Sequence, residues 1–426
     1  MLVQVSLYGR PIGTIDWDAE KGNSVFEYTD AFSSNDIEPS PILMPKEGKT
    51  YVTNRDHINF HNLPYLLSDS MPDDFGNTMM KEWLRQKNLS YDDINPVDRL
   101  TYIGIRGMGA LEYFPINHTS EKDYHIDVTE LLHVAKNVLA GKEDVVYDSL
   151  DKESLTNILR IGTSVGGARA KALIAVNEDT DGNIIEIKSG DIVQSKEFSY
   201  WLLKIDGANE MSLGESEGIG RIEYAYYKMA KNCGIEIADS RLYEEGGRSH
   251  FLTKRFDRSN DGDKIHMQTF GSLVGLDFKM PRASSYETLF RTMKRLQLPY
   301  DQFKQQYKRA VFNVIARNHD DHVKNFSFLM DKKGTWKISP AYDITYSYKP
   351  GGIWTDVHQS SINGKYTDFT KVDLVEFGKK FGIKKSKQIV EEVIHSVSEW
   401  RSIAKETEVP NDRISQIEKN LRLNIR

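Results

Sequence analysis

The stretch "NVIARNHDDHVKNFSFLMDKKGTWKISPAYDI", residues 313–344, decides the fold. It begins as an apolar, helix-like segment and ends in a polar run that contains Asp320, Asp321 and Asn325. Two strand-like segments follow, joined by an Asp-Lys-Lys-Gly turn, and Asp343 comes just after the second. Because a hairpin brings its two ends together, we expect Asp343 to lie close to the loop that carries Asp320 and Asn325.

This order of side chains predicts a magnesium-dependent phosphotransfer site. Mg²⁺ prefers hard oxygen ligands and is bound through one or two carboxylates plus substrate phosphates. Protein kinases use the same order of helix, Asp-x4-Asn loop, hairpin and Asp. We therefore predict Asp320 as the acceptor of the hydroxyl proton, and Asn325 and Asp343 as metal ligands. Any one of these residues alone is better read as part of a solvated loop, but the ordered set favours a site.

Composition limits the other classes of protein. A chain of 426 residues favours two or three packed units. The formal net charge of -6 does not support binding of duplex nucleic acid over a broad surface. The single cysteine, Cys233, excludes an internal disulfide and favours a reducing cytoplasm. Residues 1–13 do not read as a signal peptide, and no apolar run is long enough to span a membrane.

Hydrophobic periodicity predicts an α+β chain in four segments. Residues 1–115 read mainly as strands, 116–156 as a helical linker, 157–260 as strands with one helix, and 261–426 as mostly helical. Strands are expected near residues 2–8, 12–17, 170–176, 183–188, 198–206 and 250–258. Helices are expected near residues 73–86, 125–141, 219–235, 303–315 and 386–400, the last with Ser386 as its N-cap.

Two stretches upstream could hold phosphate. In "IGTSVGGARAKALIAV", residues 161–176, small residues allow backbone N–H groups to approach phosphate oxygens, and Lys171 adds a positive charge. It is not a Walker A loop, and an ordinary turn is the alternative. Lys204 lies inside an apolar strand, where it needs an anionic partner or must reach an edge. Glu223 on the following helix is a candidate partner, or a surface residue.

Other kinds of site have weaker support. His319 and His322 lack a third zinc ligand at a recognisable spacing, although His322 could contact a phosphate. No Gly-x-Ser-x-Gly elbow exists for an acyl-transfer serine. The run "KKFGIKKSK", residues 379–387, could contact nucleic acid, but a solvated helix end is the better interpretation.

Seven motifs together resemble the HipA family of bacterial toxin serine/threonine kinases. The resemblance covers nearly the whole chain and implies a two-lobed, kinase-like fold with an appended N-terminal β-rich domain at residues 1–115. In this fold, residues 157–260 would form the N-lobe and 261–426 the C-lobe. The motifs are "DSMPDDFG" (69–76), "RGMGALEYFP" (106–115), "SVGGARAK" (164–171), "KRFDR" (254–258), "MQTFG" (267–271), "HDDHVKNFS" (319–327) and "AYDI" (341–344).

The resemblance also implies roles for individual residues. A phosphate loop would bind ATP, Lys204 would meet its phosphates, a hinge would line the adenine, and the catalytic loop with Asp343 would complete the ATP site. Ser164 is implied as an inhibitory autophosphorylation site. The phosphate loop is Gly166, Gly167, Ala168, Arg169, Ala170 and Lys171; the hinge is Lys254, Arg255 and Phe256; the catalytic loop supplies His322, Val323, Lys324 and Asn325.

The same resemblance implies partners. Family members pair with a small helix-turn-helix antitoxin that binds operator DNA, so this chain would meet DNA only through that partner. The implied substrate is a protein such as an aminoacyl-tRNA synthetase. Some relatives have Asp-Gly where this chain has Asp320-Asp321, which leaves the choice of base open; the spacing to Asn325 favours Asp320. A small-molecule kinase and a catalytically silent co-repressor are the alternative functions.

Overall fold

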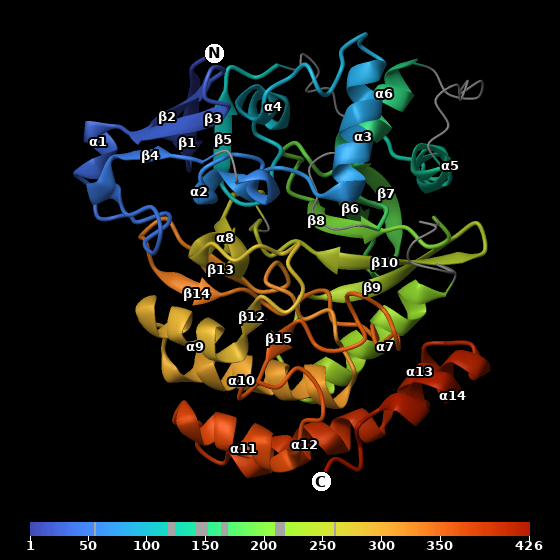
Figure 1. Cartoon of the computed structure of the whole chain (residues 1–426). Helices are drawn as coiled ribbons and strands as arrows, with labels where there is room; N and C mark the ends of the chain where they lie inside the picture. Colours follow the sequence, from blue (N-terminus) through green and yellow to red (C-terminus); the bar gives the residue numbers. More distant parts are fainter. Residues whose placement is uncertain (55–56, 118–123, 141–151, 163–168, 209–217, 260) are drawn as a thin grey trace. The chain divides into compact units, whose positions relative to one another are not determined.

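The computed structural model divides the chain into two compact units, which we describe separately (Figure 1). Unit 1 comprises Met1–Glu217, Arg241–Gln268 and Met330–Gly334, and unit 2 comprises Gly218–Ser240, Thr269–Leu329 and Thr335–Arg426. The structure describes all residues except 55–56, 118–123, 141–151, 163–168, 209–217 and 260.

The first sheet of unit 1 is a five-stranded antiparallel sheet in the order β4-β3-β2-β1-β5. Alternation of apolar and polar residues explains this sheet, because Val3, Val5 and Leu7 occupy alternate positions of β1 and are buried on one face. The two strands expected near residues 2–8 and 12–17 are confirmed. The strands are β1 (Val3–Leu7), β2 (Arg10–Asp18), β3 (Asn23–Tyr28), β4 (Thr50–Val52) and β5 (Leu111–Phe114).

The second sheet of unit 1 has the order β7-β6-β8-β10-β9. Strand β6 lies between β7 and β8 and is buried over six consecutive residues, which is why the residues after Lys171 form a continuous apolar run rather than an alternating one. The four strands expected in residues 170–258 are confirmed. The strands are β6 (Lys171–Glu178), β7 (Ile184–Ser189), β8 (Phe198–Lys204), β9 (Ser240–Glu245) and β10 (Arg248–Lys254).

Helices α3, α5 and α6 supply the core that this second sheet buries (Figure 1). The helix expected at 125–141 is confirmed as α5, with Asp127 as its N-cap accepting from the backbone N–H of Glu130. Its residues Val128, Leu131 and Val134 are buried at helical spacing. The helices of unit 1 are α1 (Asp30–Ser33), α2 (Tyr65–Ser68), α3 (Asp74–Arg85), α4 (Pro96–Ile103), α5 (Val128–Leu139) and α6 (Lys152–Gly162).

Unit 2 is mostly helical and is built around α10, in which residues 309–315 are all buried. The pattern that predicts a helix at 303–315 is confirmed, and so is the helix near 219–235. The helices are α7 (Ile219–Asn232), α8 (Phe270–Val274), α9 (Tyr286–Arg295), α10 (Tyr300–Ile315), α11 (Lys371–Lys380), α12 (Ser386–Ser398), α13 (Trp400–Glu406) and α14 (Asn411–Asn420).

The prediction that Ser386 caps its helix is wrong. Lys385 is the N-cap, in the left-handed conformation, and Ser386 is the first helical residue. Ser386 is buried instead, because its backbone carbonyl accepts from Tyr307 and its Cβ packs closely against Gly378. Trp400, which the pattern places on the same helix, begins the separate helix α13.

The hairpin that decides the fold is confirmed. Strand β13 (Ser327–Met330) neighbours β14 (Trp336–Ile338), and the backbone N–H of Ser339 donates to the carbonyl of Ser327 at 2.9 Å. Two short strands, β12 (Ser284–Ser285) and β15 (Ser360–Ser361), pair in parallel within unit 2, and β11 spans His266–Thr269. Among the described residues, no helix combines the length and apolar character that a membrane span requires.

Candidate active site

The loop after α10 is held by side chains that bind its backbone. The amide of Asn318 donates to Asn313 Oδ1 on α10 at 3.0 Å, and Ser347 Oγ donates to Asn318 Oδ1 at 3.1 Å. The backbone N–H of Asp320 in turn donates to Ser347 Oγ at 2.9 Å. This chain of bonds fixes the peptide of Asp320 relative to the end of α10.

The two adjacent carboxylates have opposite environments. The side chain of Asp320 is 45% exposed, and its Oδ1 lies 3.8 Å from Nε2 of His322. Asp321 is buried, and both of its oxygens accept hydrogen bonds from within unit 2. Only Asp320 can therefore meet a substrate hydroxyl, which favours the choice of Asp320 as the base.

The hairpin closes as the sequence predicts. The hydroxyl of Tyr342 donates to the backbone carbonyl of Lys324. Asp343 and Asn325 are the residues that directly follow these two in the sequence. Asn325 Nδ2 donates to the carbonyl of Asp320 at 2.8 Å, which leaves its amide oxygen as the atom that could face a cation. Asp343 has a φ of 53°, in the left-handed region that a non-glycine residue rarely adopts, and such strain often marks functional sites.

The remaining catalytic-loop residues have mainly local contacts. Val323 is buried and its carbonyl accepts from the backbone N–H of Gly271 at 3.1 Å. The Lys324 ammonium lies 4.0 Å from the centroid of the Phe278 ring. His322 Nδ1 accepts from the backbone N–H of Lys324 at 3.2 Å, which leaves Nε2 on the side of Asp320.

His319 is a loop residue, as the sequence predicts, and its side chain is buried. Its Nδ1 donates to the carbonyl of Thr355 at 3.1 Å, and its ring centroid lies 4.2 Å from that of His358. Burial, together with the nearby His358 and Arg317, lowers the pKa of His319 to about 2. Within the described residues, no group of three or more His, Cys, Asp and Glu side chains forms a metal site, so the zinc alternative gains no support.

In unit 1, Lys171 and Lys204 are directly opposite each other on the antiparallel strands β6 and β8. Directly opposite residues point to the same face of a sheet, so two ammonium groups emerge side by side there. Lys171 is buried, and the Lys204 ammonium lies 5.6 Å from the Phe251 ring.

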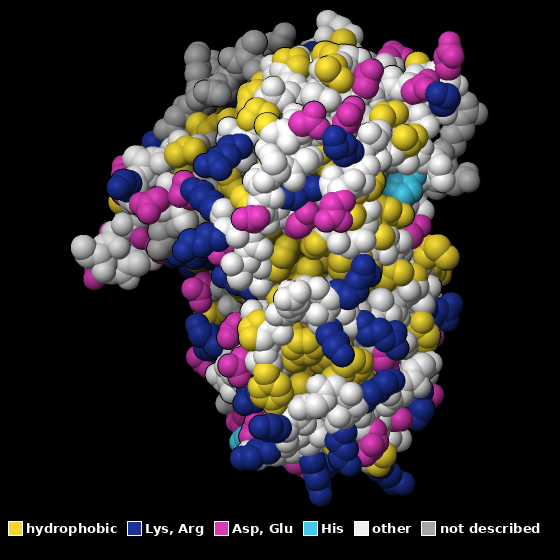
Figure 2. Space-filling model, turned by 90° about the vertical axis from the view of Figure 1, so that its left-hand side faces the viewer, with side chains coloured by type: hydrophobic (Ala, Val, Ile, Leu, Met, Phe, Trp, Pro, Cys, Tyr) yellow, Lys and Arg dark blue, Asp and Glu magenta, His cyan; other side chains and the backbone are white. Residues whose placement is uncertain are grey.

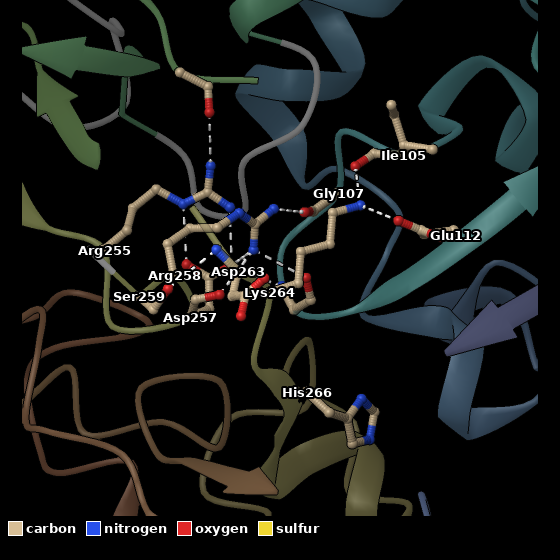
Figure 3. A network of polar contacts seen from close by, with 12 residues as sticks. Ile105, Gly107, Glu112, Arg255, Asp257, Arg258, Ser259, Asp263, Lys264 and His266 are labelled. Atoms are coloured by element: carbon tan, nitrogen blue, oxygen red, sulfur yellow. Dashed lines mark hydrogen bonds and ion pairs between the residues drawn. The ribbon is translucent and has the colours of Figure 1, made fainter. Parts of the chain in front are cut away.

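The hinge residues end strand β10 and enter a buried ionic network (Figure 3). The backbone N–H of Arg255 already donates to Tyr200, at 2.9 Å. Its guanidinium bonds both oxygens of Asp257, at 2.9 and 2.8 Å, and the carbonyl of Gly190 at 3.1 Å. The Arg255 side chain is thus structural, so any contact of Arg255 with adenine would come from its backbone carbonyl.

The same network joins the hinge to the segment 105–112 (Figure 3). Arg258 donates to the carbonyls of Gly107 and Gly109, each at 3.0 Å. Lys264 donates to the carbonyl of Ile105 at 2.6 Å and to Glu112 at 2.7 Å. Direct hydrogen bonds therefore link the segment 105–112 to the residues that follow the hinge in the sequence.

The predicted autophosphorylation site Ser164 lies outside the described residues, and so do Gly166, Gly167 and Ala168 of the predicted phosphate loop. Arg169 is half-buried, and Ala170 is buried with its carbonyl accepting from the backbone N–H of Ile205 at 3.0 Å. The Lys204–Glu223 ion pair stays a prediction; Glu223 is buried on α7.

Two features escaped sequence reasoning. One is the set of partners of Asp321, most of which come from "HQSS", residues 358–361, a run with no recognisable motif. The other is the network of Arg255, Asp257 and Arg258, for which a signal existed. Three charges in four residues at the end of an apolar strand are costly to bury unless they pair with one another.

The basic run at residues 379–387 lies at the surface, with all five of its lysines exposed. On the face that Figure 2 shows, basic and acidic side chains are interspersed with apolar ones over most of the surface.

Comparison with known proteins identifies the family. The model of the HipA-like C-terminal domain matches residues 163–401, and that of the HipA N-terminal domain matches residues 3–114. The chain belongs to the HipA family. The fold agrees: the structure of a Shewanella oneidensis HipA, in a complex with HipB and operator DNA, aligns over 98% of this chain and 95% of that one, with a TM-score of 0.65 and 17% identity.

Two curated relatives show the range of similarity. A Haemophilus influenzae protein named "Putative kinase" is 21% identical over 235 residues, which cover 47% of this chain and 67% of the relative. The "Serine/threonine-protein kinase toxin HipA" of Shewanella oneidensis is 26% identical over 144 residues, which cover 29% of this chain and 33% of the relative.

Proposed function

We propose that this HipA family member is an ATP- and Mg²⁺-dependent serine/threonine protein kinase and the toxin of a toxin–antitoxin pair. One observation carries the proposal: the side chain of Asp320 is partly exposed while that of its neighbour Asp321 is buried, in a loop whose Lys324 accepts a hydrogen bond from Tyr342, the residue before Asp343. The names of the relatives, one a kinase and one a kinase toxin, support the same activity.

The residues present fit Mg²⁺. Asn325 and Asp343 offer one amide and one carboxylate oxygen, too few for a cage of protein ligands but suited to an ion that also binds phosphates and water. A bound Mg²⁺ would neutralise charge on the phosphates of ATP. The left-handed backbone at Asp343 would set the direction of its carboxylate.

In the proposed reaction, Asp320 accepts the proton of a serine or threonine hydroxyl. The hydroxyl oxygen forms a bond to the γ-phosphorus as the bond to the β,γ-bridging oxygen breaks, which yields a phosphorylated side chain and ADP. The proton remains on the Asp320 carboxylate until solvent removes it, which its exposure allows. The hydrogen bond from the backbone N–H of Asp320 to Ser347 holds the peptide that carries this carboxylate.

Lys171 and Lys204 are proposed to bind the phosphates of ATP. Their opposition across β6 and β8 places two positive charges on one face of the sheet, an arrangement that suits a polyanionic ligand. Backbone N–H groups of residues 166–171 complete the proposed phosphate loop. Lys254 to Phe256 are proposed to line the adenine.

A small helix-turn-helix antitoxin is the proposed partner, and DNA is contacted through it. The Shewanella oneidensis complex contains HipA, HipB and operator DNA, which supports this assignment. We propose a cytoplasmic location and a protein substrate from translation, such as an aminoacyl-tRNA synthetase.

The test is direct labelling. Purified protein is incubated with γ-labelled ATP, Mg²⁺ and a cell lysate, and labelled proteins are identified by mass spectrometry. Phosphate on serine or threonine of a discrete protein, absent with Asp320→Asn and without Mg²⁺, supports the proposal. Label only on small molecules would replace it with small-molecule kinase activity, and no label above that of Asp320→Asn would overturn it.

A further inference from the structure

The chain after Asp343 returns to the loop that carries Asp320 and contacts three consecutive residues of it. We call residues 347–360 the return segment. Its Ser347 accepts from the backbone N–H of Asp320 at 2.9 Å, and its Thr355 accepts from His319 Nδ1 at 3.1 Å. Its last three residues, 358–360, all bind Asp321. Hydrogen bonds therefore hold the return segment to the loop at both of its ends and at Thr355 between them.

Asp321 is the centre of the strongest of these attachments. Its Oδ1 accepts from the backbone N–H groups of Gln359, at 2.7 Å, and Ser360, at 3.3 Å. Its Oδ2 lies 3.0 Å from His358 Nδ1, and because a carboxylate only accepts, the imidazole donates. The hydroxyl of Ser360 donates back to the carbonyl of Asp321 at 2.7 Å. The side chains of Asp321 and His358 are fully buried.

The helices of unit 2 hold the other side of this carboxylate. Tyr286, at the start of α9, donates to Asp321 Oδ2 at 2.9 Å, and Asn313 of α10 donates to the Tyr286 hydroxyl at 2.9 Å. Ser360 pairs with Ser284 in the β12–β15 bridge. A buried carboxylate is stable only with its donors in place, so the removal of one donor must move the group or its neighbours.

We propose that Asp321 and His358 are positioning residues that hold Asp320 at the geometry for proton acceptance. The inference rests on the proposed kinase activity. Asp321 touches no substrate, but it shares a peptide bond with Asp320, so a shift of the buried carboxylate rotates the exposed one. An ordered return segment thereby becomes a condition for phosphotransfer. We expect a loss of this positioning to slow the chemical step and to leave ATP binding unchanged, because other residues are proposed to bind the phosphates of ATP.

The first test separates turnover from ATP binding. His358→Leu removes the donor at similar volume, and we expect kcat to fall at least about 10-fold with KM for ATP within about twofold. His358→Asn keeps an N–H donor near the position of Nδ1, and we expect its kcat to stay within about threefold of wild type. Asp321→Asn, which cannot accept from all the donors, should behave like His358→Leu. His395→Leu, an exposed position on α12, is the matched control.

The second test does not depend on activity. Hydrogen–deuterium exchange of amides in the return segment should quicken in His358→Leu and Asp321→Asn but not in His395→Leu. If the wild-type protein transfers no phosphate, the proposed function fails, while exchange still tests the attachment. Unchanged exchange, an equal loss of kcat in His358→Asn and His358→Leu, or a loss confined to KM would each overturn the positioning role. If His358→Leu does not fold, the same measurements are made on Ser360→Ala, which removes only one hydroxyl.

Discussion

The carboxylate of Asp257 accepts a hydrogen bond of 2.8 Å from the backbone N–H of Gly109, although 148 residues separate them. Gly109 has a φ of 77°, and a Cβ there would lie 3.1 Å from the backbone nitrogen of Met267, so only glycine fits. The bond ties the segment 105–112, which belongs to the match with the HipA N-terminal domain, to the residues just after the predicted hinge. Both segments belong to unit 1. The N-terminal domain is thus part of the support of the hinge.

Asp257→Asn should destabilise the protein by about 3–5 kcal/mol, because it leaves two buried guanidinium groups without their carboxylate. Burial alone would raise the pKa of Asp257, but Arg255 and Arg258 outweigh it and hold the pKa well below 3.8. The contribution is therefore present above that ordinary value and is lost as pH falls toward the folded-state pKa. Thermal melting at pH 7 measures the effect, with Asp36→Asn as an exposed control. Equal melting temperatures would refute a stabilising role.

Lys264 predicts a pH dependence of the same sign in an alkaline window. Burial, only partly offset by Glu112, lowers the pKa of Lys264 from 10.5 to about 8. Between these values the folded protein releases a proton that the unfolded chain retains, so the free energy of unfolding should rise with pH in this window. Lys264→Met should remove this rise, and Lys196→Met, on an exposed side chain, should keep it. Urea unfolding at pH 7.5 and pH 10 compares the three proteins; parallel changes in all of them would exclude Lys264 as the cause.

Replacement of the two predicted catalytic carboxylates should have different effects. Asp320→Asn should lower turnover at least about 100-fold, since it removes the proton acceptor, and should leave ATP binding nearly unchanged. Asp343→Asn should also weaken binding of ATP in the presence of Mg²⁺. Thermal stabilisation by ATP with and without Mg²⁺ separates the two, because a ligand bound only to the native state raises the melting temperature. Near-wild-type turnover in either variant would place the site elsewhere.

The sequence predicts the fold and the site to different depths. Periodicity locates α10 and the β13–β14 hairpin because each is a local pattern of apolar residues with a clear turn between them. It cannot distinguish Asp320 from Asp321, since the difference lies in donors such as His358, far along the chain. Ser386 shows the same limit: its sequence suits a cap, but close packing against Gly378 decides its place. Long-range contacts, rather than local propensity, determine these details.

Operator binding should require a partner. The net charge of -6 predicts weak, salt-sensitive binding of duplex DNA by the chain alone. We expect sequence-specific binding only with a small antitoxin, encoded beside this protein. Gel-shift titration of the chain, the antitoxin and the mixture measures this. Tight specific binding by the chain alone would contradict the prediction and favour the co-repressor function.

The last prediction concerns Ser164, which precedes the Gly166-Gly167 pair and lies outside the described residues. Its sequence position also suits a turn serine that bonds neighbouring backbone. We expect autophosphorylation at Ser164 to inhibit the kinase, because phosphoserine adds roughly two negative charges and three acceptor oxygens. Beside the proposed phosphate loop, these would repel ATP and compete for Lys171.

Mass spectrometry after incubation with Mg²⁺ and ATP should find phosphate on Ser164, and Asp320→Asn should prevent it. Ser164→Asp should bind ATP more weakly than the wild type, whereas Ser164→Ala should bind it as the unmodified protein does. The comparison of phosphorylated with unmodified protein is the sharper measurement, since one carboxylate carries less charge than a phosphate. Equal ATP affinity of the two forms would exclude inhibition by charge even if the phosphate is present. Weaker binding by the phosphorylated form alone, with Ser164→Ala unaffected, would show that the hydroxyl itself is dispensable and that the added charge is the inhibitory element.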